Sequence, residues 1–141
     1  MKKAKLDYVK VLTIAVIAIV LVMTFIPINP WSTPPHHSET VSYKLYSFFE
    51  NVVNAARSSY PFVVAFGILF YLATIAAIVF LLLNKRNIYL ASLALGMFCM
   101  TPFLYPLFLS MYFALGVILI YVVLIVFELI IRYKHQVNVN K

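Results

Sequence analysis

The sequence predicts an all-α integral membrane protein with four transmembrane helices, both termini in the cytoplasm and one amphipathic helix in the first outer loop. Of the 141 residues, 65% are hydrophobic and 11% are charged, whereas a soluble domain is about half apolar and about a quarter charged. Long uncharged runs recur along the chain, and most basic residues lie between or beyond them. A soluble fold of this length could not bury so much apolar surface, so lipid must solvate a large part of it.

The first predicted span covers about residues 9–27 and is built on the uncharged run 11–26, which stops at Pro27. The run is a little shorter than the roughly 20 residues that cross a bilayer, so flanking residues extend it and Lys10 reaches back to the interface. The basic segment before it resembles the start of a signal peptide. No small-x-small cleavage pattern follows, so we expect an uncleaved signal anchor.

The first outer loop has two parts. Residues 27–35 hold four of the seven prolines and are expected to be extended, partly as polyproline helix. Apolar residues then recur at helical spacing over about residues 40–57, which predicts an amphipathic helix that starts near Ser38 and Glu39. Two locations remain open for this helix, the outer headgroup region and a partner subunit.

Three more spans follow, at about residues 60–83, 88–104 and 107–131. Pro61 suits the first turn of a helix, where its missing N–H is not needed. The 40 uncharged residues from 88 to 127 are too long for one span, and Pro102 and Pro106 mark a hairpin between two. Residues 132–141 form a cytoplasmic tail, and the whole chain 1–141 is one membrane domain.

The orientation follows from the excess of Lys and Arg that cytoplasmic segments carry. With the N-terminus inside the cell, the outer segments hold only Lys44 and Arg57. The inner segments hold Lys2, Lys3, Lys5, Lys10, Lys85, Arg86, Arg132, Lys134 and Lys141. Expected interfacial aromatics agree: Tyr8, Tyr89 and Tyr133 on the inner side, and Trp31, Tyr60 and Tyr105 on the outer side. We therefore expect a multi-pass protein of the cell membrane.

Glu128 is the only acidic residue within a predicted span. It lies near the inner end of the fourth span, and Arg132 follows it four residues later, in the favourable order for a helical ion pair. An interfacial salt bridge is the preferred interpretation. A proton or ion site is the alternative, although such sites usually lie nearer the middle of the membrane.

Other reactive residues do not form a recognisable site. His36 and His37 are adjacent in the outer loop, but a metal site needs three or four donors. His135 falls in the tail, and Cys99 is expected to be a packing residue. We therefore expect no enzymatic activity, no catalytic residue, and no metal or cofactor site. Nor do we expect nucleic-acid binding, because the basic residues form no stripe interleaved with aromatics.

Several features indicate helix packing. Small residues occur at four-residue spacing as Ala73 and Ala77, Ser92 and Gly96, and Ser110 and Ala114, a pattern that lets helices approach closely. Tyr71, Thr74 and Tyr121 lie near the middle of their spans, where their hydroxyls must face protein. Large aromatics crowd the outer half and are expected to pack together: Phe62, Phe66, Phe70, Phe103, Phe108, Tyr112 and Phe113.

These observations favour a non-catalytic accessory or structural subunit of a larger membrane complex, for example a respiratory or other energy-converting one. Its partners would be the lipid bilayer and other integral membrane subunits. The alternative is a small homo-oligomeric transporter or channel, which needs a polar stripe along a span, and Thr13, Thr24, Thr74 and Ser92 supply only a sparse one. A structural protein of a viral envelope is a third interpretation.

Overall fold

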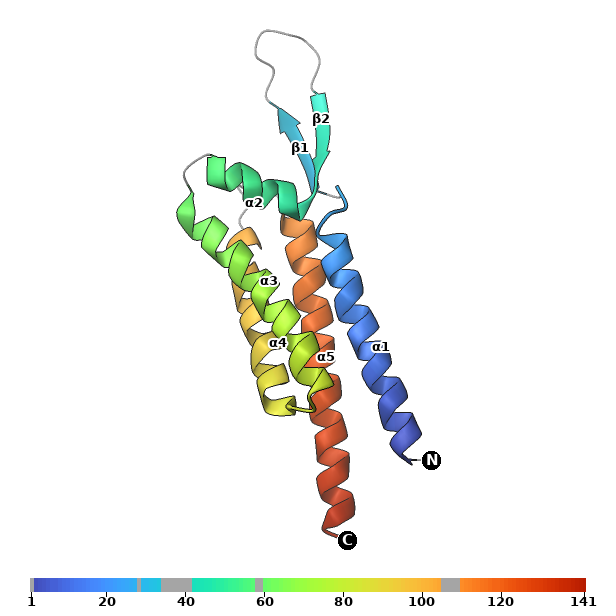
Figure 1. The fold of residues 1–141 in the computed structure, drawn as a ribbon. Helices are drawn as coiled ribbons and strands as arrows, with labels where there is room; N and C mark the ends of the chain where they lie inside the picture. The colour runs from blue at the N-terminus through green and yellow to red at the C-terminus, as the bar shows by residue number, and fades with distance from the viewer. Residues whose placement is uncertain (1, 28, 34–41, 58–59, 105–109) are drawn as a thin grey trace.

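The computed structural model describes residues 2–27, 29–33, 42–57, 60–104 and 110–141, with only the backbone described for 2–6, 29–33 and 42–46. Four helices run along a bundle, and a shorter fifth helix crosses one end of it (Figure 1). The long helices are α1 (Lys2–Met23), α3 (Pro61–Leu82), α4 (Arg86–Met100) and α5 (Met111–Val139), and the crossing helix is α2 (Phe48–Arg57). Both termini lie at the opposite end from α2, which we call the terminal end.

Among the described residues, three helical segments are long and apolar enough to cross a membrane, which supports the predicted membrane class. They are α3, α4 together with the 3-10 turn η1 (Thr101–Leu104), and α5. The bounds of α3 differ by one residue at each end from the expected 60–83. Helix α5 begins at Met111 instead of about 107 and continues to Val139, so most of the expected tail is helical.

The first outer loop differs from the expectation of a helix over 40–57. Strands β1 (Asn29–Thr33) and β2 (Ser42–Tyr46) form an antiparallel hairpin that projects beyond α2 (Figure 1). Residues 29–33 are therefore extended, as expected, but residues 42–46 form a strand and the helix begins only at Phe48. The proposed helix start at Ser38 and Glu39 lies outside the described residues.

A capping box fixes the true start of α2. The backbone N–H of Glu50 donates to Ser47 Oγ at 3.1 Å, and the backbone N–H of Ser47 donates to Glu50 Oε2 at 2.8 Å. This reciprocal pair satisfies two donors that the first turn of a helix would otherwise leave unpaired. The backbone N–H of Phe49 also donates to the Thr24 carbonyl at 3.0 Å, which ties α2 to the end of α1.

The turn between α3 and α4 is a compact left-handed cap. Asn84 has φ of 57°, a conformation that asparagine tolerates better than most residues. The backbone N–H of Lys85 donates to the Phe80 carbonyl, and that of Asn84 to the Leu81 carbonyl, at 2.8 and 3.2 Å. These are the two bonds of a Schellman motif, which closes the carbonyl end of a helix.

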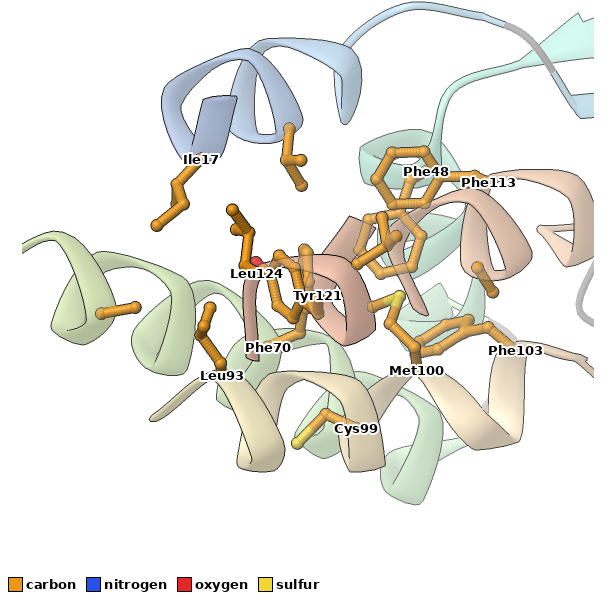
Figure 2. Close-up of a cluster of buried hydrophobic side chains, with 14 of the residues drawn as sticks. Ile17, Phe48, Phe70, Leu93, Cys99, Met100, Phe103, Phe113, Tyr121 and Leu124 are labelled. Carbon is orange, nitrogen blue, oxygen red and sulfur yellow. The ribbon is translucent and has the colours of Figure 1, made fainter. Parts of the chain in front are cut away.

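The core of the bundle is apolar, and two glycines set the closest helix contacts. A Cβ at Gly67 would lie 2.7 Å from Cγ2 of Val52, so glycine lets α2 rest on α3. A Cβ at Gly96 would lie 2.8 Å from Cε2 of Tyr121, so glycine admits the Tyr121 ring against α4. Figure 2 shows Tyr121 beside Phe70 in this core.

Candidate functional site

The main cluster of charged side chains lies at the terminal end of the bundle, around Glu128. This residue is only 6% exposed. Its Oε1 accepts from Arg86 Nη1 of α4 at 3.2 Å and from Arg132 Nε of its own helix at 3.4 Å. The predicted pair with Arg132 is therefore present, and the carboxylate also joins α5 to α4 through a second arginine.

Two asparagines extend this cluster, Asn84 in the α3–α4 turn and Asn87 in the first turn of α4. Arg132 Nη1 donates to Asn87 Oδ1 at 2.7 Å. Lys10 Nζ of α1 donates to Asn84 Oδ1 at 3.0 Å and to the Leu82 carbonyl at 2.9 Å. The turn is thus held to α5 by one cation and to α1 by another.

A small cavity adjoins the carboxylate between α1 and α5. Its volume is about 20 Å³, and its polar lining consists of Lys10, Thr13, Arg86, Tyr89 and Glu128. A space of this size holds about one water molecule if two to four polar groups surround it. Two guanidinium groups face one carboxylate here, and this excess of positive charge disfavours a bound cation. Tyr89, expected near the inner membrane interface, lies in the first turn of α4 and is fully buried beside this cluster.

The hydroxyl groups in the middle of the bundle are largely bonded within the chain. Tyr121 and Thr74 form a buried hydrogen bond of 2.6 Å between α5 and α3, as expected for hydroxyls that face protein. Thr13 donates to the Val9 carbonyl at 2.9 Å, one turn earlier in α1.

Tyr71 differs from these residues. Its hydroxyl is buried, and no hydrogen bond reaches it from the described residues. Thr24 lies beside it, but the Thr24 hydroxyl donates to the Leu21 carbonyl at 2.6 Å. Because its proton is used on the Leu21 carbonyl, the Thr24 hydroxyl faces Tyr71 as an acceptor only.

An aromatic cluster closes the other end of the bundle around Phe48, the first residue of α2. The Phe48 ring is fully buried, with centroids 4.8 Å from Phe103, 5.0 Å from Phe113 and 5.5 Å from Phe70. Figure 2 shows Phe48 beside Phe113. The predicted aromatic packing is confirmed for Phe70, Phe103 and Phe113, and Phe108 lies outside the described residues.

The amphipathic helix therefore rests on its own bundle. Its residues Phe48, Val52 and Ala55 are buried. Its polar residue Asn51 donates through Nδ2 to Ser110 Oγ, at the start of α5, at 2.7 Å. Of the apolar stripe that predicted a membrane or partner contact for this helix, Phe48 and Val52 are buried against the bundle, whereas Phe49 is 44% exposed and Ala56 is also exposed.

The small residues at four-residue spacing also face inward. All six are buried within the chain: Ala73, Ala77, Ser92, Gly96, Ser110 and Ala114. The close helix contacts that they permit are internal, as the approach of Tyr121 to Gly96 shows. The outward faces of the spans carry large aliphatic side chains, such as Leu72, Leu119 and Val123.

The remaining reactive residues stay apart. His36 and His37 lie outside the described residues, His135 is exposed on α5, and Cys99 is a free, buried thiol. Within the described part of the chain, no three His, Cys, Asp or Glu residues come close enough to hold a metal ion.

Sequence reasoning missed Arg86, Asn87 and Lys10 as partners of the Glu128 cluster. The run Asn84-Lys85-Arg86-Asn87 was a visible signal, but its contacts cross more than 40 positions of sequence. Comparison of the chain with protein-family models, curated proteins and solved structures finds no match.

Proposed function

We propose that the chain is a four-span protein of the cell membrane, with both termini in the cytoplasm, that serves as a non-catalytic subunit of a larger membrane complex. Helix α1 would be the fourth span, because its 22 residues extend over about 33 Å and its second half is uncharged. The shared position of the termini at one end of the bundle (Figure 1) supports an even number of spans. The nine inner cations against two outer ones support the orientation.

One observation favours a structural role over transport. Four hydroxyls that a pore or a transport path could use are already bonded within the chain. Tyr121 bonds to Thr74, and Thr13 and Thr24 donate to backbone carbonyls. Opening a polar path through one chain would break these bonds in a medium that offers no replacement. These internal hydrogen bonds therefore favour a bundle without a polar path through it.

The outward faces support a role among other helices. Only 33%, 39% and 28% of the residues in the three apolar windows are buried inside the chain. The other residues of these spans are partly or fully exposed on the surface of the chain. Because the exposed residues on these faces are mainly aliphatic, such as Leu72, Leu119 and Val123, they suit apolar packing against neighbouring subunits rather than hydrogen-bonded assembly.

The decisive experiment is extraction of the full-length, tagged chain from its native membranes in mild detergent, with the mass and composition of the intact particle measured. We expect other integral membrane chains at fixed stoichiometry, and the same chains after a second, different detergent. A matched sample with the tag on an unrelated four-span protein controls for chance retention. A particle that contains only copies of this chain would overturn the proposal in favour of a homo-oligomeric transporter or channel.

The topology can be tested separately because Cys99 is the only cysteine and is buried. In a Cys99→Ala background, single cysteines would replace exposed residues at the two ends, as Lys134→Cys and Arg57→Cys. We expect a membrane-impermeant maleimide to label the Arg57→Cys variant in intact cells and the Lys134→Cys variant only after lysis. The reverse pattern would overturn the orientation, and labelling of both in intact cells would overturn the even number of spans.

A further inference from the structure

The surface of the α3–α4 turn has an open hollow of about 390 Å³. Its lining consists of Asn84, Lys85, Arg86, Asn87 and Ile88. The side-chain polar groups of this lining are hydrogen-bond donors, or they are asparagine oxygens that already accept from a cation. The hollow therefore selects for a negatively charged ligand.

Two internal contacts set this donor character. Asn84 Oδ1 accepts from Lys10, and Asn87 Oδ1 accepts from Arg132. Ammonium and guanidinium groups only donate, so each asparagine must turn its oxygen toward its cation. The two amide NH₂ groups are left as donors beside the side chains of Lys85 and Arg86.

The charge balance around the hollow is strongly positive. Four cations line it or bond to its lining, namely Lys10, Lys85, Arg86 and Arg132. Among the described residues, the carboxylate that pairs with this group is that of Glu128. One carboxylate neutralises one of the four charges, and the remainder favours an anion such as a phosphate group.

Exposed aliphatic side chains adjoin the hollow in the chain. Ile88, which lines it, is 45% exposed, and Leu82 and Leu83, which immediately precede Asn84, are more than half exposed. Donors for a phosphate thus lie directly beside aliphatic surface that continues along two membrane-spanning helices. A free phosphate would contact only the donors. A phospholipid would contact the donors with its head group and the aliphatic surface with its acyl chains.

We propose that the α3–α4 turn binds the phosphate group of an anionic phospholipid, with Lys85, Arg86 and the amide groups of Asn84 and Asn87 as donors. The lipid lies in the leaflet next to the terminal end of the bundle, which is the cytoplasmic leaflet if the proposed topology holds. Basic residues at the end of a span are attracted to the anionic lipids of that leaflet. Helix-end contacts of this kind fix lipids at defined positions around a subunit.

The test uses the full-length chain in mild detergent, titrated with phosphatidylglycerol or phosphatidylcholine, with bound lipid counted by native mass spectrometry. We expect preferential retention of phosphatidylglycerol. Lys85→Gln should weaken it about fivefold, the effect of about 1 kcal/mol for one cation at an anionic surface. Asn87→Asp should weaken it further, because the new carboxylate still accepts from Arg132 but repels phosphate.

Lys134→Gln is the matched control, because Lys134 is exposed on α5 at the same end and does not line the hollow. It should leave retention unchanged. Equal retention of both lipids, or equal losses in Lys134→Gln and Lys85→Gln, would overturn the site. Displacement of phosphatidylglycerol by millimolar inorganic phosphate would overturn a lipid as the occupant. Lipid retention is measured on the purified chain, whereas partner chains are identified in the particle from native membranes. Either result can therefore fail while the other is obtained.

Discussion

Glu128 Oε1 on α5 lies 3.2 Å from Nη1 of Arg86, the first residue of α4, and the two residues are 42 positions apart in sequence. The carboxylate is 8% exposed, while the Arg86 and Arg132 side chains that it pairs with are 32% and 31% exposed. One nearly buried acid thus holds two half-buried cations at the terminal end of the bundle.

Replacing this acid should destabilise the fold. Glu128→Gln keeps the shape but removes the charge that offsets two guanidinium groups. We expect a loss of about 1–3 kcal/mol in the free energy of unfolding, less than for a fully buried pair because water reaches the arginines. Denaturation in detergent micelles measures it. Asp7→Asn, at an exposed acid of α1, should change nothing, and equal stability of the two variants would contradict the role of the Glu128 cluster.

The contact of α2 with α3 can be tested at Gly67. Gly67→Ala places a methyl group 2.7 Å from Val52 Cγ2, and we expect about 1–3 kcal/mol of destabilisation from overpacking. Adding Val52→Ala should recover part of this loss, because the clashing atoms are removed. Gly116→Ala is the control, because its Cβ would meet no atom within 4 Å. If Gly116→Ala lost as much stability as Gly67→Ala, helix propensity or general packing would explain the effect instead.

The hydrogen bond between Tyr121 and Thr74 should couple α5 to α3 energetically. Tyr121→Phe and Thr74→Val each remove one partner of a 2.6 Å bond, and we expect about 0.5–1.5 kcal/mol of lost stability for each. The double variant should lose less than the sum, with a coupling of about 0.6 kcal/mol, typical of such pairs in membranes. Additive losses in this double-mutant cycle would mean that the bond contributes no pairwise stabilisation.

The capping box should control the stability of α2. Ser47→Ala removes the oxygen that accepts from the Glu50 N–H, at a cost of about 1 kcal/mol. Hydrogen exchange of the α2 amides should become several times faster, while exchange in α4 stays the same. Glu50→Gln retains an acceptor for the Ser47 N–H and should alter exchange far less. Similar exchange in the wild type and in Ser47→Ala would indicate that packing of Phe48 alone holds the helix.

The α3 span could be predicted closely from composition because a long uncharged run determines it, whereas the ends of α4 and α5 differ by two to eight residues from the expected 88–104 and 107–131. The run from Tyr60 to Leu83 predicted α3 within one residue of its bounds. The pair of Glu128 with Arg132 was also predictable, because residues four apart face each other on a helix. The contact with Arg86 was not, since it depends on how α4 packs against α5.

The amphipathic helix was predicted only in its second half. Apolar residues at 41, 45, 48, 49 and 52 fit a helical period, but residues 42–46 also alternate polar and apolar, as a strand does. The pattern Ser47-x-x-Glu50 was the stronger local signal for the start of the helix. What buries the apolar stripe of this helix could not be predicted from sequence, because the stripe does not indicate whether lipid, a partner or the same chain covers it.

The packing of the Phe48 ring constrains the order in which contacts can form while the chain is synthesised. Its ring packs against Phe70, Phe103 and Phe113, and the last two emerge from the ribosome long after α2 has been synthesised. During biogenesis the Val52 side of α2 can rest on α3 as soon as α3 has been made, whereas the contacts of the Phe48 ring with Phe103 and Phe113 form only when the rest of the chain has been synthesised. A chain that is truncated before α5 would therefore keep part of the Phe48 ring uncovered.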